Sequence, residues 1–424
     1  MVELCISSKS TVLKLRMGVL VALVIGVAAC GGGSTSGTTG HTPSSGILTD
    51  DPVGGVSYLT STGVSGVTAT DGTYNFNVGD TVEFKLGSLV LGNVTATGIV
   101  TPIELAAGNS NRLTNLLVTL QSLDVDGNPA NGISIPPLAA AAVTTAIDLT
   151  IAPASFNTTA LQAAMTAGGI TAPIVTEAEA RASFLAQGMT LFSSNIWVSL
   201  PAANTDGSTA LLRFAANGDY LHGQAGVAVG SGTTGVEQGS ASLPSFDTNG
   251  FKFAASAVVD TNLQWGLSHP QPCDHFRSVG DQLIANEGTT ADGGVTCTQN
   301  INATISKAEN SPTGIVGVWA HGSATVVNTQ HFAFFSNGKF LMVDPIGDTT
   351  VGIGHPCGGP GVESGTYTYS ANTLTVSNFD FDTNGCAGLK DSAASKSLTF
   401  IIGTNGATAT LGVDPAVTLF RVSK

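Results

Sequence analysis

The sequence predicts a mainly β protein built from a small β-sandwich, a short helical connector and two tandem antiparallel β-barrel or meander modules. Glycine supplies 53 of the 424 residues and charged residues only 10%, which is typical of exported β-proteins whose hydroxyl and amide side chains cover the solvent face. Short apolar alternations separated by turn residues run through both ends of the chain. A set of motifs in the second half also recurs at nearly constant spacing.

Residues 47–101 contain the first group of predicted strands. Asp71-Gly72 indicates a hairpin or tight turn, and Tyr74 and Phe76 fall on one face of the strand that follows. The stretch TATDGTYNF from Thr68 to Phe76 resembles the T-x-x-D-G-x-Y-x-F segment of carboxypeptidase-regulatory-like and other prealbumin-like sandwich domains. The resemblance implies a small β-sandwich over these residues.

Residues 102–190 change to helical patterns and are expected to form the connector. Ala139–Ile147 is rich in alanine, and Thr176 to Glu179 forms a capping box that opens a helix continuing to about Gln187. An earlier helix is indicated by leucines at helical spacing: Leu113, Leu116, Leu117, Leu120 and Leu123. None of these helices is long enough to be stable alone, so they should pack on the sandwich or on the following module.

The second half of the chain contains an internal repeat. The tryptophan at 197 recurs 122 residues later at 319, the Asn-Gly at 217 recurs 120 residues later at 337, and the Asp-Thr-Asn at 260 recurs 122 residues later at 382. Asn-Gly between apolar alternations is a strong hairpin signal. The repeat therefore predicts two antiparallel modules, residues 191–307 and 313–424, each an up-and-down sheet with its tryptophan at one end.

The second module resembles lipocalin-like (calycin) barrels. The resemblance rests on Gly317-Val318-Trp319, the Asn337-Gly338 hairpin and Gly365-Thr366-Tyr367. It implies a carrier of a small apolar ligand, and the aromatic residues Trp319, Phe334, Phe340 and Tyr367 would line its cavity; as the alternative, they form an ordinary core. The first module departs from the pattern, with Asn195 in place of the first glycine.

The N-terminus resembles a bacterial lipoprotein signal peptide. Val27-Ala28-Ala29-Cys30 follows an apolar run over residues 17–27, which is about half the length that a membrane-spanning helix needs, and Lys9, Lys14 and Arg16 precede the run. The resemblance implies removal of residues 1–29 and acylation of Cys30. It also implies a lipid anchor in the outer membrane, because Gly31 rather than aspartate follows the cysteine. The folded part would then face either the periplasm or the cell exterior.

Cleavage would leave 12 of the 15 basic and 28 of the 29 acidic side chains, since Lys9, Lys14, Arg16 and Glu3 are lost. Such an acidic surface repels phosphates and anionic head groups, which excludes nucleic acid as an expected partner. Membrane attachment would then come from the acyl chains. Residues 30–46 should form a flexible tether without apolar periodicity.

Four cysteines remain after the anchor residue: Cys273, Cys297, Cys357 and Cys386. Their even number in an exported protein favours disulfides, and three connectivities are open. We prefer 273–297 and 357–386, because each pair then lies within one module. A zinc site at His269 to His275, with His355-Pro356-Cys357 as its echo, is the weaker alternative, because a disulfide removes the thiolates.

Asp124, Asp126 and Asn128 place three oxygen side chains at alternate positions, which is how a loop wraps calcium. An EF-hand would need glycine and a bidentate acid where this chain has Pro129 and Ile135. The alternative is a polar turn after a helix. The sequence therefore predicts no cofactor, with calcium at these residues as the alternative.

Two acids recur in both modules, Glu237 with Asp260 and Glu363 with Asp382. Paired carboxylates serve hydrolysis in glycosidases. The alternative, in which Asp-Thr-Asn caps a turn and the glutamate marks an edge strand, is favoured because structural signatures persist in both copies of a duplication. The chain has no G-x-S-x-G, H-E-x-x-H, P-loop or C-x-x-C motif.

These observations predict a lipid-anchored, non-enzymatic binding or adhesin-like protein of the cell envelope, with a glycan or matrix component as partner. A calycin-like carrier of a small apolar ligand is the alternative. A hydrolase that uses the paired carboxylates is the third.

Overall fold

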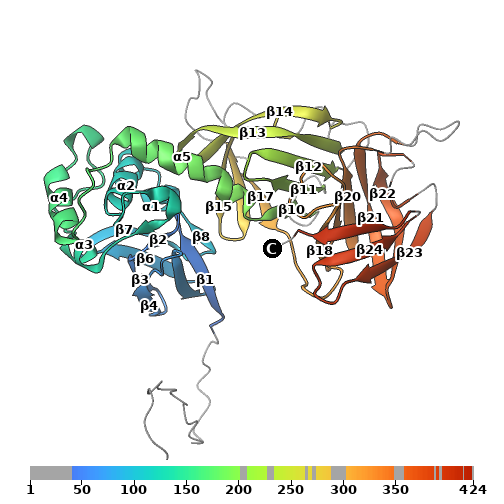
Figure 1. The fold of residues 1–424 in the computed structure, drawn as a ribbon, viewed down its shortest axis with the longest axis horizontal. Helices are drawn as coiled ribbons and strands as arrows, with labels where there is room; N and C mark the ends of the chain where they lie inside the picture. Colours follow the sequence, from blue (N-terminus) through green and yellow to red (C-terminus); the bar gives the residue numbers. More distant parts are fainter. Residues whose placement is uncertain are drawn as a thin grey trace, which may run out of the picture. The chain divides into compact units, whose positions relative to one another are not determined.

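The computed structural model describes residues 41–200, 208–226, 234–262, 266–269, 274–287, 302–347, 358–385, 388–390, 394–413 and 415–422. The chain divides into two units, Met1–Gly40 and His41–Lys424, and all described residues belong to the second. Cys30 with its signal motif therefore lies outside the described residues, as do Cys273, Cys297, Cys357 and Cys386. The described part is mainly β, as predicted (Figure 1).

The N-terminal β region consists of small sheets. One has the order β5 (Thr73–Asn77), β1 (Pro43–Leu48), β8 (Ile99–Val100). Another has the order β4 (Ser65–Val67), β3 (Ser57–Thr60), β6 (Thr81–Leu86), β7 (Leu89–Thr95), and β2 (Val53–Gly54) pairs with β9 (Ile133–Ser134).

Aromatic side chains join the two larger sheets. The ring of Tyr74 on β5 lies 5.8 Å from that of Tyr58 on β3 and 5.1 Å from that of Phe84 on β6. Tyr74 and Phe76 are both buried, which confirms the predicted face. Asp71-Gly72 makes a tight turn between strands of different sheets, so no hairpin forms there. Strand β1 begins at Pro43, so the last residues predicted as tether are in fact paired with β5.

The helices follow the predicted order: α1 (Pro102–Ala106), α2 (Ser110–Ser122), α3 (Pro137–Ala142), α4 (Thr158–Ala167) and α5 (Glu177–Ser193), with 3-10 turns η1 (Pro129–Asn131) and η2 (Pro153–Ser155). The capping box of α5 is present, with Thr176 and Glu179 bonded reciprocally. This helix continues six residues beyond the predicted end at Gln187. Among the described residues, no helix combines the length and apolar character needed to cross a bilayer.

The repeat forms two closed eight-stranded antiparallel barrels. The first contains β10 (Ile196–Ser199), β11 (Thr209–Phe214), β12 (Asp219–Ala225), β13 (Gly235–Asp247), β14 (Gly250–Asp260), β15 (Asp274–Val279), β16 (Gln282–Glu287) and β17 (Asn302–Lys307). The second contains β18 (Gly317–His321), β19 (His331–Phe334), β20 (Lys339–Asp344), β21 (Gly361–Ser370), β22 (Thr373–Asp382), β23 (Ser395–Ile402), β24 (Thr408–Gly412) and β25 (Val417–Arg421).

Equivalent residues close the two barrels. Trp197 on β10 pairs with Lys307 on β17, and Trp319 on β18 pairs with Arg421 on β25. The Asn-Gly pairs at 217, 249, 337 and 405 lie between paired strands, as the hairpin signal predicts. At the first of these turns Gly218 has φ +92°, and a Cβ there would lie 2.3 Å from the carbonyl oxygen of Ala241, so only glycine fits.

Helix α5 packs against the first barrel. The ring of Phe192 lies 5.0 Å from that of Phe253 on β14, and the ring of Phe184 lies 4.9 Å from that of Phe246 on β13. A Cβ at Gly188 would lie 2.5 Å from Leu243 Cδ1, so this glycine allows the helix its close approach. The helical connector and the barrel interior thus share one apolar core.

The two barrels contact each other through β11, β12 and β13 of the first and β20 and β21 of the second. Every described residue of β11 and β19 is buried, because one face fills a barrel interior and the other joins an apolar cluster shared by both barrels. Gly223 on β12 meets the side chain of Val343 on β20. The guanidinium of Arg213 donates to the carbonyl oxygens of Val326 and Ala324 and contacts His331.

Candidate functional site

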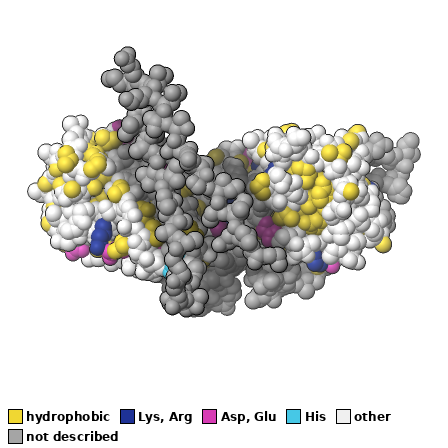
Figure 2. Space-filling view, turned by 90° about the horizontal axis from the view of Figure 1, so that it is seen from below, with side chains coloured by type: hydrophobic (Ala, Val, Ile, Leu, Met, Phe, Trp, Pro, Cys, Tyr) yellow, Lys and Arg dark blue, Asp and Glu magenta, His cyan; other side chains and the backbone are white. Residues whose placement is uncertain are grey.

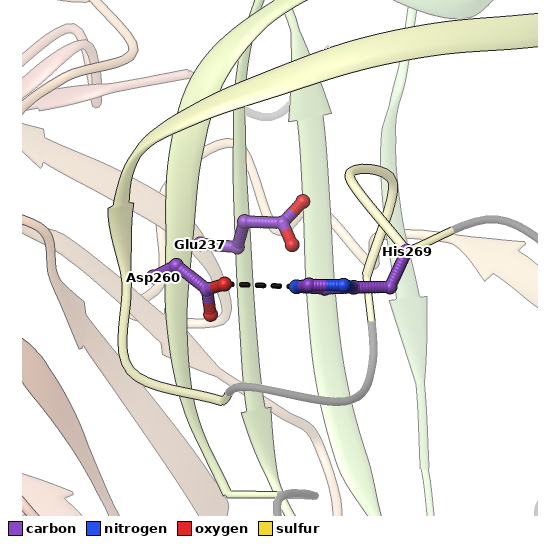
Figure 3. A group of neighbouring side chains, drawn as sticks. All are labelled: Glu237, Asp260 and His269. Atoms are coloured by element: carbon purple, nitrogen blue, oxygen red, sulfur yellow. Dashed lines mark hydrogen bonds and ion pairs between the residues drawn. The ribbon is translucent and has the colours of Figure 1, made fainter.

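A cluster of polar side chains lies in the first barrel, where β13 begins and β14 ends. The Asn249-Gly250 turn joins these antiparallel strands, so Glu237 near the start of one is the register partner of Asp260 at the end of the other. Register partners project to the same side of a sheet. The chain then turns back, and its residues Gly266 to His269 lie over the two acids (Figure 3).

Glu237 is fully buried, and both of its carboxylate oxygens accept hydrogen bonds. Its Oε1 accepts from the Tyr220 hydroxyl at 2.6 Å and from the Ser268 backbone N–H at 3.0 Å, and its Oε2 accepts from the Ser268 hydroxyl at 2.7 Å. Burial, together with the bond to the glutamate, raises the pKa of Tyr220, so the phenol keeps its proton and remains a donor. The carboxylate therefore fixes the returning loop to the barrel.

Asp260 and His269 form the more open part of the cluster. His269 Nε2 lies 2.8 Å from Asp260 Oδ2, and the side chains are 38% and 24% exposed, respectively. One ligand-type atom from each of Glu237, Asp260 and His269 lies within 4.8 Å of those of the other two. Figure 3 shows the three side chains converging from β13, β14 and the returning loop.

His222 and Asn262 lie beside this cluster. His222 on β12 is the register partner of Glu237, and Asn262 Nδ2 lies 3.3 Å from His222 Nδ1. Burial lowers the pKa of His222, and the charge of Glu237 offsets part of that shift, so the imidazole is neutral near pH 7 and Nδ1 accepts from the amide. The Oδ1 of Asn262 is buried and has no hydrogen-bond partner.

Gly266 allows the returning loop to pass close to the glutamate. Its φ is +121°, and a Cβ there would lie 2.5 Å from Glu237 Oε2. Gly388 stands 122 residues later with φ +110°, where a Cβ would lie 2.8 Å from Glu363 Oε1. This repeated glycine was available in the sequence, but only the structure relates it to the acid.

The second barrel contains the equivalent acid with different partners. Glu363 is fully buried, its Oε2 accepts from the Leu389 N–H at 2.7 Å, and its Oε1 accepts from the Lys390 N–H at 3.3 Å. The Lys390 ammonium lies 3.1 Å from Asp382 Oδ2. Burial raises the pKa of Glu363 to about 7. Phe340 takes the place of Tyr220 here, so that position offers no phenol donor to Glu363.

The structure places the predicted calcium residues in a hydrogen-bonded turn. Asp124 accepts from the backbone N–H groups of Asn128 and Ser134, both at 2.9 Å. Asp126 accepts from the Asn128 N–H at 2.9 Å and from Asn131 Nδ2 at 3.0 Å. Each of the four carboxylate oxygens thus accepts a hydrogen bond from the protein.

The histidines of the predicted metal loop contact different acids. His269 pairs with Asp260, whereas the buried His275 lies 3.1 Å from Asp247 on β13. The described residues therefore bring His269 to the repeated acids, which the sequence had treated as a separate motif.

The four predicted ligand-lining residues lie within packed surroundings. The rings of Trp319 and Phe334 lie 5.4 and 5.7 Å from that of Phe400, and the ring of Phe340 lies 5.9 Å from that of Phe379. The hydroxyl of Tyr367 donates to the Phe335 carbonyl at 2.9 Å. Trp319, Phe334 and Phe340 are buried at 2% exposure or less, which is the environment of core residues.

Chemically, the first-barrel cluster offers two carboxylates and one imidazole at a partly open position, a set that binds cations and exchanges protons. Tyr220, Ser268, Gly266 and Asn262 surround it. Asn262 belongs to the repeated Asp-Thr-Asn that the sequence analysis interpreted as a turn cap, and none of the four was predicted as a site residue. The chain matches no family model, no curated protein and no solved structure.

Proposed function

We propose that this chain is a lipid-anchored protein of the bacterial outer membrane whose folded part binds an uncharged polar partner, such as a glycan or matrix component, without catalysing a reaction. The observation that supports this best is the packed interior of the second barrel, where Phe400 contacts both Trp319 and Phe334. Because core side chains occupy that space, recognition falls to the outer surface.

The character of the outer surface agrees with such a partner. Only 10% of the chain is charged, and Figure 2 shows a face whose described part carries scattered Lys, Arg, Asp and Glu side chains beside larger hydrophobic areas. Val258 on β14 is 82% exposed and Val67 on β4 is 61% exposed. Exposed apolar side chains among hydroxyl and amide groups suit contact with the apolar faces and hydroxyls of sugars.

The anchor is tested by labelling cells with a palmitate analogue and measuring the intact mass of the purified chain. We expect the wild-type chain to begin at Cys30, to carry acyl chains and to partition into the detergent phase of Triton X-114. Cys30→Ala should retain the signal segment and lose the label. Cys5→Ala is the matched control, because this cysteine lies upstream of the cleavage site and should change nothing.

Binding is tested by applying the mature chain, in detergent, to glycan and extracellular-matrix arrays. We expect saturable binding to uncharged glycans or matrix proteins that changes little between 50 and 300 mM salt, because few charges are available for ionic contacts. A second lipoprotein in the same detergent controls for micelle adsorption. Arrays without signal above that control would contradict the proposal.

A further inference from the structure

We propose that Glu237, Asp260 and His269 bind a divalent metal ion of the zinc class in the first barrel. This site is independent of the lipid anchor and of the surface partner proposed above. It joins two motifs that the sequence analysis treated separately, the repeated acids and the first histidine of the Pro-rich loop.

The distances allow coordination after a small movement. Zinc bonds of about 2.0–2.2 Å place neighbouring ligand atoms roughly 3–3.5 Å apart. His269 Nε2 and Asp260 Oδ2 are already 2.8 Å apart, and the three ligand atoms lie within 4.8 Å of one another. His269 is 38% exposed, so its imidazole has room to turn and an ion has a route from solvent.

Glu237 has both a coordinating position and the supports that a ligand needs. Its Oε1 is occupied by two donors, the Tyr220 hydroxyl and the Ser268 N–H, whereas its Oε2 accepts a single bond, from the Ser268 hydroxyl. A carboxylate oxygen carries two lone pairs, so one on Oε2 remains for a metal. Hydrogen bonds to the ligand residues orient them in known metal sites.

Asn262 follows Asp260 by two residues, and its Nδ2 faces His222, the register partner of Glu237. Its Oδ1 is buried without a partner, and so is the Oδ1 of Asn384, the equivalent residue of the second barrel. The orphaned oxygen is therefore a feature of both barrels, and the metal site rests on the three ligand residues.

The second barrel has a positive charge beside its acid pair, Glu363 and Asp382. There the Lys390 ammonium lies 3.1 Å from Asp382, and its backbone N–H donates to Glu363, so a fixed positive charge stands beside the acid pair. The equivalent position, 122 residues earlier, is Ser268, which brings no charge. A bound metal ion supplies in the first barrel the charge that a lysine supplies in the second.

The donor set selects the class of metal. Imidazole is a preferred ligand of zinc and its first-row neighbours, whereas calcium and magnesium prefer all-oxygen sites with six or more ligands. Two carboxylates, one imidazole and one water form the four-coordinate arrangement that zinc adopts.

The test is titration of the metal-free mature chain, in detergent and with its thiols alkylated, with zinc chloride, followed by calorimetry and metal analysis. We expect one zinc per chain at this site and an affinity for calcium at least about tenfold weaker. His269→Gln and Asp260→Asn should each weaken zinc binding by tenfold or more, since each removes a ligand. His321→Gln, a histidine of the second barrel, is the matched control and should bind zinc as the wild type does.

Ser268→Lys provides a second, sharper variant. It introduces the ammonium of the second barrel, so zinc binding should be lost while the near-ultraviolet circular dichroism of the chain stays native. If His269→Gln and Ser268→Lys both bind zinc as tightly as the wild type, the site is wrong. Absence of zinc binding to the wild-type chain at micromolar concentrations would overturn it equally.

Discussion

The two barrels share a fold and a buried glutamate but differ in what surrounds that glutamate. In the first barrel Glu237 is held by the Tyr220 hydroxyl and by Ser268; in the second, Glu363 is held by two backbone N–H groups. The shared role is structural, because in both copies the acid ties the loop after the long hairpin to the barrel. The difference lies in charge, since Lys390 is fixed beside one acid pair and His269 beside the other.

The barrels also differ at their closing strands. Trp319 is covered by the Arg421 guanidinium, whose central carbon lies 4.0 Å from the ring centre. Trp197 has Lys307 as its register partner instead. Both tryptophans are fully buried and each donates its ring N–H to a carbonyl, that of Phe192 or of Ile315. A buried tryptophan thus occupies the same place in both barrels, and in the second barrel a guanidinium lies over its ring.

The largest effect is expected when the buried tryptophan of either barrel is replaced. Trp197→Ala and Trp319→Ala should each lower the free energy of unfolding by about 3–5 kcal/mol, because each empties a large volume in a packed core. Trp319→Ala should cost more, since Arg421 loses its aromatic partner as well. Chemical denaturation of both variants measures the difference. Equal costs would show that the arginine cover contributes nothing.

The second prediction concerns pH. The pKa of Glu363 in the folded chain is about 7, above its ordinary value of 4.5. The folded chain therefore keeps a proton that the unfolded chain has released, and the free energy of unfolding falls as pH rises from about 4.5 to 7. The loss should be roughly 2–3 kcal/mol. Thermal unfolding of Glu363→Gln from pH 4 to 8 should show a flatter profile than the wild type, and parallel profiles would contradict the assignment.

The third prediction concerns Arg421 and Lys307, the basic residues that pair with the tryptophans where each barrel closes. Arg421→Lys should cost about 1–2 kcal/mol, because lysine cannot reproduce the guanidinium bonds to the Gly406 and Val316 carbonyls, 2.7 and 3.0 Å long, or the stacking on Trp319. The reciprocal Lys307→Arg serves as the control and should change stability by less than about 0.5 kcal/mol. If both exchanges have the same effect, the two closures are equivalent.

The smallest effect is expected for a substitution that makes the surroundings of Glu237 resemble those of Glu363. Tyr220→Phe removes the 2.6 Å bond to Glu237 and installs the residue that Phe340 represents in the other barrel. We expect a loss of about 1 kcal/mol, because the two Ser268 bonds remain. Equilibrium unfolding in denaturant measures it. A loss above about 3 kcal/mol would mean that the phenol, rather than the loop, holds the carboxylate.

Much of the architecture could be predicted from local signals. The Asn-Gly turns, the period-two alternation of Tyr74 and Phe76, and the Thr176 capping box are encoded within a few residues, and each occurs where it was expected. The constant spacing of the repeat predicted two copies of one module. Closure of each copy depends on pairing between its first and last strands, which are about 100–110 residues apart, and no local pattern specifies that.

The candidate site could be predicted only in part. Glu237 and Asp260 stood out because they recur, but His269 was grouped with His275 by spacing, and the fold sends the two histidines to different acids. Nothing in the sequence marked Tyr220 or Ser268 as site residues, since a tyrosine in a strand and a serine in a loop are common. Their roles depend on which side of the barrel each strand presents.

The sequence by itself determined the class of fold, the number of modules and the positions of the main turns, because these depend on backbone preferences and on the alternation of apolar residues over short distances. Only the tertiary structure decided that β11 and β19 are buried on both faces, that α5 joins the first barrel's core, and that an acid pair meets His269 in one barrel and Lys390 in the other. Contacts between segments distant along the chain depend on packing and on the path of loops, which residue spacing does not encode.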